Sequence, residues 1–402
     1  MKHGWPLKRL GDVARIKHGY AFSGMAADAA AHLPVVVGIG NFEYSGGFRF
    51  DSTTVKRYSG SYPDEFKLCA GDVLLAMTCQ TAGGEILGIP GRIPDDGTTY
   101  LHNQRLGKVE VRIQDQLDLG FMFQLARSSS FNRHLYTTAS GSKILHTSPG
   151  RIEDFQLSCP PIEEQRGIAT TLGALDDKIE SNRRTVDLVP RLIRAMVCQA
   201  LDDEARKIAV ANLANFVNGG AYTKGASGTG RMVIRIAELN SGPGGSTVYS
   251  EIEAPDEKTA RPGDLLMSWS GSLGIYRWVL NEAIINQHIF KVIPSDGYPT
   301  WLVFDRLDQV MSVFQGIAKD KATTMGHIQR GHLESTTVSV PSQPTIAALD
   351  DQLAPLWDRL LLAERENVTL AALRDTLLPE LLSGRIRVPE ARETVAEIAA
   401  SV

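Results

Sequence analysis

Apolar residues recur at alternating steps of four and three along two stretches of this chain, the spacing that places side chains on one face of a long α-helix. Each series includes one asparagine, and an asparagine buried in such a seam costs stability but fixes register or orientation. We call these positions the seam: Ile168, Leu172, Leu175, Ile179, Asn182, Leu349, Leu353, Leu356, Leu360 and Asn367. The pattern predicts two long helices, over residues 161–205 and 343–388, that pair as an antiparallel coiled coil. The alternative is that each helix packs on its own domain as ordinary core.

Prolines and a glycine modify this prediction. Pro190 and Pro355 lie inside the two stretches, and a proline in a helix interior kinks or interrupts the helix. Gly384 follows the last apolar residues and predicts the end of the second helix. Residues 389–402 are then expected to form a short, loosely held tail.

Short runs of β-forming residues separated by glycine fill most of the remaining sequence. Residues 107–113 alternate between apolar and polar types, as a half-buried strand does. Helices are expected near residues 117–128 and 301–316. These patterns predict one mixed α/β domain over residues 1–160 and another over residues 206–342.

The two halves share motifs at matching positions. A Pro-Asp-Glu triplet precedes a Gly-Asp pair by the same interval at Pro63 and at Pro255. An Asn-Gln pair begins at Asn103 and again at Asn286. The repeat predicts a duplicated domain-plus-helix unit with pseudo-two-fold symmetry. The predicted fold class is therefore α+β, with two mixed α/β domains joined by two long helices.

Composition is that of a globular protein, with 43% hydrophobic and 22% charged residues among 402. The net charge of −4 does not by itself indicate a nucleic-acid-binding protein. Residues 1–160 carry 17 Lys and Arg against 15 Asp and Glu, however, and residues 206–342 carry 13 against 12, whereas both helical stretches are acidic. This distribution suits domains that face DNA and helices that face protein, although random scatter of surface charge would produce it too.

Neither a membrane span nor a disulfide framework is indicated. No apolar run reaches the ~18 residues that a membrane span needs, and the first residues lack the apolar stretch of a secretory signal. The cysteines show no zinc-site spacing, and we expect free thiols in a cytoplasmic protein. They are Cys69, Cys79, Cys159 and Cys198.

Three segments resemble a known family. Residues 160–165, Pro-Pro-Ile-Glu-Glu-Gln, and residues 175–179, Leu-Asp-Asp-Lys-Ile, are similar to the central helix of the specificity subunit of Type I restriction-modification systems. Residues 373–386 resemble the C-terminal signature of that subunit, and Trp5-Pro6-Leu7 resembles its usual start. Residues 341–345, Pro-Ser-Gln-Pro-Thr, depart from a second Pro-Pro-x-x-Glu-Gln, so exact equivalence of the two halves is not expected.

The resemblance implies a DNA sequence-recognition subunit that is not itself catalytic. Two target-recognition domains would each read one half of a bipartite, asymmetric target in double-stranded DNA, and the paired helices would set the gap between the halves. The implied partners are two adenine methyltransferase subunits and motor-nuclease (restriction/translocase) subunits. S-adenosylmethionine, ATP and Mg²⁺ would be bound by those partners, with no cofactor in this chain.

Reading bases requires hydrogen-bonding side chains that can reach the major groove. In each half, a predicted strand begins at the Gly-Asp pair, and residues with hydroxyl or amide side chains follow it close to glycines. These residues either contact bases or stabilise turns. Arg105 and His288 occupy matching positions but differ, as residues that discriminate unequal half-sites must, whereas the shared Asn103 and Asn286 suit a structural role. Nearby lysines either contact phosphates or lie in solvated loops. The DNA-binding candidates are Thr78, Gln80, Thr81, Arg105, Ser142, Lys143, Ser268, Ser270, Ser272, His288, Lys319 and Lys321.

Three motifs resemble those of enzymes but lack the features that their chemistry needs. Residues 64–67, Asp-Glu-Phe-Lys, compress a nuclease signature until its carboxylates are adjacent. Residues 140–143 contain Ser-x-x-Lys without its partner motifs, and residues 38–40 lack the third glycine of a nucleotide loop. No catalytic or metal-binding residue is predicted. The rival functions are a hydrolase that uses one of these motifs, and a coiled-coil scaffold that binds protein without sequence-specific DNA binding.

Overall fold

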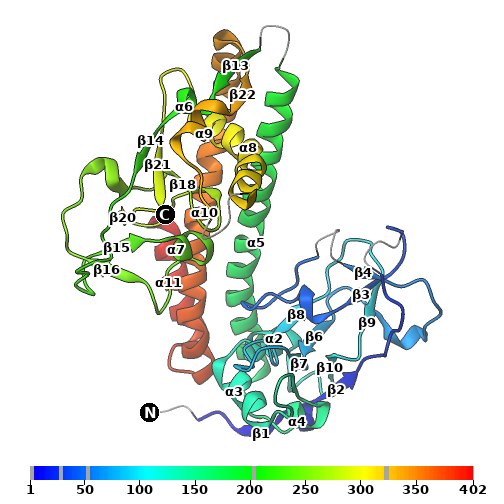
Figure 1. Ribbon diagram of the computed structural model, residues 1–402. Coiled ribbons are helices and arrows are strands. Elements are labelled where there is room, and N and C mark those ends of the chain that lie inside the picture. Colours follow the sequence, from blue (N-terminus) through cyan, green and yellow to red (C-terminus); the bar gives the residue numbers. More distant parts are fainter. Residues whose placement is uncertain (1–3, 27–29, 51–54, 202–204, 321–325, 402) are drawn as a thin grey trace. The chain divides into compact units, whose positions relative to one another are not determined.

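The computed structural model describes residues 4–26, 30–50, 55–201, 205–320 and 326–401 (Figure 1). The chain divides into two compact units, and unit 1 is assembled from parts that are distant in sequence. Unit 1 comprises Met1–Asp177 with Ala371–Val402, and unit 2 comprises Lys178–Leu370. Each unit contains one α/β domain and part of both long helices.

The domain of unit 1 is built on two sheets whose strands interleave in sequence. The first has the antiparallel order β2 (Ala14–His18), β10 (Leu106–Val111), β6 (Val73–Ala76), β8 (Pro90–Arg92). The second has the order β4 (Lys56–Arg57), β3 (Val35–Val37), β9 (Tyr100–His102), β5 (Lys67–Leu68), in which β3 and β9 run parallel. β1 (Leu7–Arg9) pairs with β12 (Gln156–Ser158), and β7 (Thr78–Cys79) pairs with β11 (Leu145–His146).

The domain of unit 2 repeats the topology of both four-stranded sheets, and an isolated bridge between Ser270 and His327 stands where unit 1 has the pair β7 and β11. Its first sheet has the order β14 (Ala214–Asn218), β21 (Ile289–Pro294), β18 (Leu265–Ser268), β19 (Gly274–Arg277). Its second has the order β16 (Val248–Ser250), β15 (Arg231–Ile234), β20 (Ala283–Ile285), β17 (Thr259–Ala260), again with the inner pair, β15 and β20, parallel. β13 (Arg206–Ala209) pairs with β22 (Thr337–Val340) as β1 pairs with β12. The predicted internal repeat is confirmed.

Short helices connect the strands. Those of unit 1 are α1 (Leu10–Val13), η1 (Ile39–Asn41), η2 (Asp64–Phe66), α2 (Leu119–Ala126), α3 (Ser129–Thr138) and α4 (Pro149–Glu153). Those of unit 2 are α6 (Val210–Leu213), α7 (Ile236–Ser241), η3 (Asp256–Lys258), α8 (Thr300–Asp320) and α9 (Arg330–Ser335). The units differ here, because unit 2 has one long helix, α8, where unit 1 has α2 and α3.

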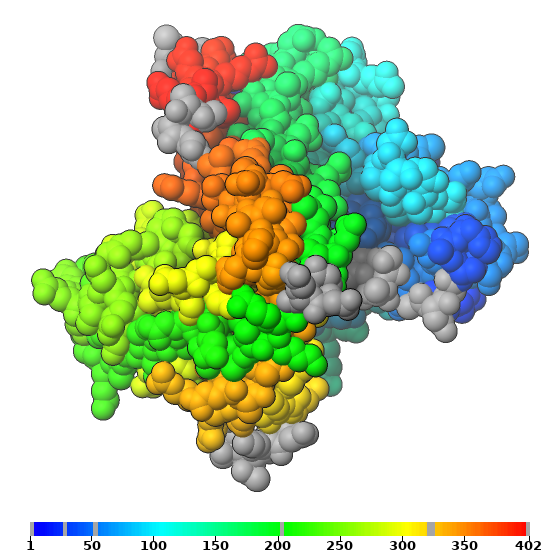
Figure 2. Space-filling view, turned by 90° about the horizontal axis from the view of Figure 1, so that it is seen from above, coloured from blue at the N-terminus to red at the C-terminus, as the bar shows by residue number. Residues whose placement is uncertain are grey.

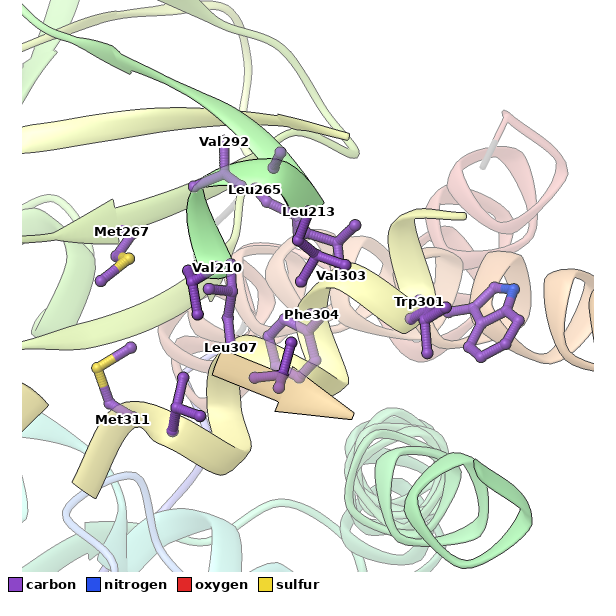
Figure 3. Packing of buried hydrophobic residues seen from close by; sticks show 14 of the residues in the cluster. Val210, Leu213, Leu265, Met267, Val292, Trp301, Val303, Phe304, Leu307 and Met311 are labelled. Carbon is purple, nitrogen blue, oxygen red and sulfur yellow. The ribbon is translucent and has the colours of Figure 1, made fainter. Parts of the chain in front are cut away.

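The core of unit 2 joins its domain to both long helices. Figure 3 shows members of this core that come from α6, β18, β21 and α8 of the domain. Trp301, Leu302, Val303 and Leu307 of α8 are each at most 1% exposed and pack with residues from β18 and α6. The Trp301 indole nitrogen also donates to Asp350 Oδ1 at 2.7 Å. In the space-filling view the first part of the second long helix, in orange, lies against yellow segments of this domain (Figure 2).

The long helices are α5 (Ile162–Gln199) and α10 (Gln343–Ser383). Both continue through their internal prolines, so the interruption allowed for at Pro190 and Pro355 does not occur. A proline costs a helix about 3 kcal/mol, and burial of neighbours such as Val189 and Leu353 offsets this. Gly384, with φ of 69°, ends α10 as predicted. No helix in the described part of the chain is long and apolar enough to cross a membrane.

Polar contacts in each unit show how α5 and α10 pair. In unit 1, Arg374 contacts Asp176 at 3.2 Å and Arg387 contacts Glu164 at 3.2 Å, so the later position on one segment meets the earlier position on the other. This confirms antiparallel pairing. In unit 2, Asn182 is 1% exposed and donates to Glu366 Oε2 at 2.8 Å.

Glu366 of unit 2 also forms an ion pair with Lys178, in which Glu366 Oε2 lies 2.8 Å from Lys178 Nζ. Partial burial raises the pKa of Glu366, but the hydrogen bonds from Lys178 and Asn182 outweigh burial and lower it. The buried asparagine therefore meets a charged partner on the opposite helix, rather than a second asparagine.

Most of the seam is buried. Ile168, Leu172, Leu175, Ile179, Asn182, Leu349, Leu353 and Leu360 are at most 9% exposed. Leu356 and Asn367 are half-buried, and Trp357, next to Leu356, takes the buried position instead. In unit 2, Val189 and Ile193 of α5 share one core with Leu353 of α10 and with the domain. The sequence allowed either a coiled coil of the two helices or packing of each helix on its own domain. In unit 2 the helices pack both on each other and on the domain.

The expectation of a loose tail after residue 388 is wrong. Residues Val388–Ser401 form the helix α11, in which Val388 is 7% and Ala391 0% exposed. Arg392 Nε donates to Thr171 Oγ1 of α5 at 3.4 Å, and Val388 packs over Gly167. The apolar residues at 388, 391, 395 and 398 follow helical spacing, which gives α11 an apolar face to bury in unit 1.

Unit 1 depends on a shared carboxylate on α5. Asp176 accepts from Arg127 at 2.7 Å and from Arg374 at 3.2 Å, and the side chains of both arginines are at most 8% exposed. Burial lowers the pKa of Arg127, against the opposing effect of Asp176. Arg374 also donates to Asp375 Oδ1, at 2.7 Å, whereas Asp176 is the carboxylate paired with Arg127. We predict that Asp176→Ala destabilises unit 1 by about 2–3 kcal/mol, because it leaves the buried charge of Arg127 without its ion-pair partner. Urea unfolding measures this, with the adjacent exposed Asp177→Ala as the control expected to change stability by less than about 0.5 kcal/mol. Equal effects of the two substitutions would contradict the assignment.

A buried histidine makes unit 1 sensitive to acid. Burial, together with the nearby charges of Lys108 and Lys17, lowers the pKa of His102 on β9 from 6.5 to about 4, against the opposing effect of its hydrogen bond to the Leu106 carbonyl. As the pH falls, the unfolded chain therefore takes up this proton before the folded chain does. The contribution of neutral His102 to the free energy of unfolding is fully present above pH 6.5. It is lost as the pH falls towards 4, and the loss is about 3 kcal/mol. Urea unfolding between pH 7.5 and 4 measures the loss. His102→Gln, which can still donate to the Leu106 carbonyl, is predicted to show a shallower pH dependence, and an unchanged slope would contradict the prediction.

Candidate nucleic-acid interface

Three segments of unit 1 meet where β6 passes into β7. The Met77 amide donates to the Arg105 carbonyl at 3.0 Å, and the Met77 carbonyl accepts from the Thr147 amide at 2.9 Å. β7 then pairs with β11, so that Thr78 lies opposite His146. Segments 77–81, 103–105 and 140–147 thereby form one surface, although the sequence separates them widely.

Unit 2 repeats this junction bond for bond. The Trp269 amide donates to the His288 carbonyl at 3.2 Å, and the Trp269 carbonyl accepts from the Ile328 amide at 3.0 Å. Ser270 forms a β-bridge with His327, as Thr78 pairs with His146. The candidates that the repeat predicted therefore gather at equivalent places in the two domains.

A glycine at the same place in each domain allows two backbone segments to lie close together. In unit 1 the turn after β9 approaches Gly19, and in unit 2 the turn after β20 approaches Gly219. A Cβ at Gly19 would lie 2.2 Å from the Asn103 carbonyl oxygen, and a Cβ at Gly219 would lie 2.2 Å from that of Asn286. Asn103 Oδ1 accepts from the Arg105 amide at 3.1 Å, and Asn103 is 8% exposed. The repeated asparagine in unit 1 therefore shapes the turn, which agrees with the structural role favoured for it.

Burial removes three candidates from contact with a ligand. Thr78 is 4% exposed, and its Oγ1 lies 3.3 Å from His146 Nδ1. Ser268 is 0% exposed, donates to the Ser272 carbonyl and accepts from the Gly274 amide at 2.9 Å. Ser270 is 5% exposed in its bridge. We correct their assignment: these hydroxyl residues stabilise the junction, which is the turn role weighed against base reading.

The remaining described candidates keep accessible surface. His288 is half-buried; Gln80, Thr81, Arg105, Ser142, Lys143, Ser272 and Lys319 are exposed. Among the ion pairs of the described residues none involves Arg105, Lys143 or Lys319, so each cation can pair with an incoming anion. Lys321 lies outside the described residues.

A cavity of about 710 Å³ opens beside the junction of unit 1. Gln80, Thr81 and Arg105 line it. Gln104 and Tyr44 line it as well, and sequence reasoning did not select them. Tyr44 could have been selected from the sequence, because it is an aromatic residue close to the pair Gly46-Gly47. Two consecutive glycines indicate a turn, and a large side chain in a surface turn is seldom buried in the core.

Unit 2 presents aromatic rings at the corresponding strand end. Trp269 follows β18 as Met77 follows β6, and its ring centroid lies 5.3 Å from that of His288 and 5.9 Å from that of Phe290. Its indole nitrogen donates to Asn218 Oδ1 at 2.9 Å. The position of Phe290 in β21 is held by Gly107 in β10. The two junctions share their backbone and differ in the side chains they offer.

The acidic residues of the compressed nuclease motif lie on the surface, and one of them forms an ion pair. Asp64 and Glu65 lie on η2, and Glu65 Oε2 pairs with Lys17 at 2.9 Å. Within the described ranges, no group of three or more His, Cys, Asp or Glu residues is placed to hold a metal ion.

Comparison with known proteins relates the chain to one family. Residues 2–189 match the family model of the Type I restriction modification DNA specificity domain. The MjaIX specificity subunit of a Type I restriction enzyme from Methanocaldococcus jannaschii is 20% identical over 309 residues, which cover 67% of this chain and 69% of that protein. The MjaVIII specificity subunit of the same organism is 27% identical over 135 residues, 33% of this chain and 31% of that protein. The crystal structure of a Type-I restriction-modification system S subunit from M. genitalium superposes with a TM-score of 0.61 at 14% identity, covering 94% of this chain and 96% of that one.

The close approach at Gly219 gives a test of the junction of unit 2. We predict that Gly219→Ala destabilises unit 2 by about 1–3 kcal/mol, because the added methyl group forces the turn at Asn286 away. Thermal unfolding measures the loss, and Trp269 fluorescence reports the local shift. Gly244→Ala is the control, since no atom lies within 4 Å of its Cβ position; equal behaviour of the two variants would refute the packing argument.

Proposed function

Because the chain belongs to the specificity subunits of Type I restriction-modification systems, whose task is DNA target recognition, we propose that it reads a bipartite, asymmetric target in double-stranded DNA. The observation that carries the proposal is the duplicated junction with unequal exposed side chains. Arg105 in unit 1 corresponds to His288 in unit 2, and both carbonyls accept the same backbone bond. An equal pair of readers would suit a palindrome, whereas unequal readers require two different half-sites.

The exposed side chains supply both kinds of DNA contact. Arginine reads guanine through two hydrogen bonds in the major groove, and amides read adenine, which suits Arg105 and Gln80. Lys143 and Lys319 carry unpaired charge in exposed positions, and such residues contact phosphates and position a protein without reading sequence. Ser272 and His288 are the accessible candidates for the second half-site.

The partners follow from the same proposal. We propose that α5 and α10 set the gap between half-sites and carry two methyltransferase subunits, which bind S-adenosylmethionine. Motor-nuclease subunits that use ATP and Mg²⁺ would join for cleavage. In this proposal the chain itself contributes no catalytic group and no cofactor, and it acts in the cytoplasm, where its DNA is.

The test is to express the chain with its methyltransferase subunits and sequence the modified adenines in the host DNA. We expect one motif made of two different half-sites with a constant gap. Binding of the purified complex to that motif is expected to weaken steeply with salt, because phosphate contacts release counterions. A complex that binds DNA without sequence preference, or not at all, would favour the scaffold alternative.

Arg105 provides the residue-level test. We predict that Arg105→Ala lowers affinity for the motif by about 10- to 100-fold and relaxes specificity at one or two positions of a single half-site. Competition binding with singly substituted sites measures both effects. Arg133→Ala removes an equally exposed arginine on α3 that does not line the cavity, and it is expected to leave specificity unchanged. Relaxation in both half-sites would contradict separate reading by the two domains.

A further inference from the structure

The shape of the unit 1 site differs from what groove reading requires. A side chain that reads the major groove has to stand out from the protein, because the groove is about 12 Å wide and about 8.5 Å deep. The amide side chains Gln80 and Gln104 instead line a cavity of about 710 Å³. That volume falls within the range of small-molecule sites, about 300–1,000 Å³. The cavity is therefore large enough to admit a small part of a ligand.

One wall of the cavity is a rigid turn that displays an aromatic ring. Phe42 and Phe48 form a β-bridge, with ring centroids 4.5 Å apart, and the Glu43 amide donates to the Gly47 carbonyl at 3.1 Å. Arg127 Nε donates to the Ser45 carbonyl at 2.9 Å and anchors the tip. Tyr44 is 60% exposed on this turn and lines the cavity. A large exposed ring held on a fixed backbone is a stacking surface.

Other residues that line the cavity offer hydrogen-bonding groups that have no other partner. The Gln104 amide donates to the Tyr20 carbonyl at 2.9 Å, which fixes its backbone while its side chain is exposed. Among the hydrogen bonds of the described residues none involves the side chain of Gln80 or Gln104. Each amide carries a donor and an acceptor, which matches the polar edge of a nucleobase.

Unpaired positive charge lies at the same cavity. Lys56 and Arg105 are exposed, line it, and take part in no ion pair among the described residues. A nucleotide that leaves the duplex brings its flanking phosphates to the mouth of the site that receives its base. Lys56 can bind them there, while Arg105 stays available to a neighbouring base pair of the duplex.

We propose that this cavity receives one nucleobase of the target, turned out of the duplex, with Tyr44 as its stacking surface and Gln80 and Gln104 as the groups that read its edge. This deepens the proposed function and rests on it. Proteins that take up an extruded base combine stacking with hydrogen bonds to the base edge, and both are present here. The first half-site is then selected partly by which base the cavity accepts.

The experiment uses the complex of this chain with its methyltransferase subunits and the motif found by sequencing. At each position of both half-sites in turn, the opposite base is replaced by an abasic site, which removes the pairing that extrusion must break. Methyltransferases also extrude their target bases, so the adenines that they modify are expected to gain affinity in every variant. We expect one further position, in the first half-site, at which the wild-type complex binds about tenfold more tightly. Tyr44→Ala and Gln104→Ala are expected to reduce this gain to less than about twofold.

Matched controls separate a binding role from a general loss of structure. Tyr136→Ala removes another exposed tyrosine of unit 1, and Gln114→Ala another exposed glutamine, and neither residue lines the cavity. Both controls are expected to keep the tenfold gain. Permanganate or chloroacetaldehyde reactivity of bases around the site gives a second readout of unpairing that does not depend on affinity.

Three outcomes count against the proposal. Sequence-specific binding with no gain in affinity beyond the modified adenines would show that the cavity takes no base, while the proposed recognition function stands. A gain that persists in Tyr44→Ala and Gln104→Ala would assign the extruded base to a methyltransferase subunit. Absence of sequence-specific binding altogether would overturn the proposed function and this inference with it.

Discussion

The pairing of buried charge around Asp176 is the interaction on which unit 1 depends. Its carboxylate is shared by Arg127 from the domain and by Arg374, which is 198 positions further along the chain. Neither guanidinium has appreciable access to water, and a buried charge without a partner is far more costly than an exposed one. A domain whose strands end at Ser158 is therefore completed by residues near the C-terminus.

In unit 2 the contacts between the domain and the long helices are mainly apolar. Trp301, Phe304 and Trp357 bring α8 and α10 into one core, and Arg277 pairs with Glu364 to tie β19 to α10. In both units a segment of each long helix contributes to the domain core as well as to the helix pair. Separating the helices would consequently open both cores. Their pairing combines buried apolar residues with polar contacts in each unit, at Asp176 in unit 1 and at Glu366 in unit 2.

Duplication has kept the backbone of the junction and varied its accessible side chains. The glycines at 19 and 219 and the hydroxyl residues Thr78 and Ser270 serve the shared backbone. The differences fall at the surface, where a cavity with amides and an exposed tyrosine in unit 1 contrasts with Trp269 and His288 in unit 2. A rigid frame with variable side chains is the arrangement that sequence discrimination requires, since the frame sets position and the side chains choose the base.

The amino-acid sequence by itself determined the two long helices, their antiparallel pairing and the duplicated plan, because each follows from periodicity or from repeated motifs along the chain. It did not determine α11, the place of Trp357 in the seam, the burial of Thr78, Ser268 and Ser270, or the cavity beside Tyr44. A serine or threonine next to glycine has the same sequence pattern whether its hydroxyl faces solvent or a group far along the chain; Thr78 meets His146, 68 residues away. Burial and concavity arise from segments that only the tertiary fold brings together, and these decided which candidates can touch a ligand.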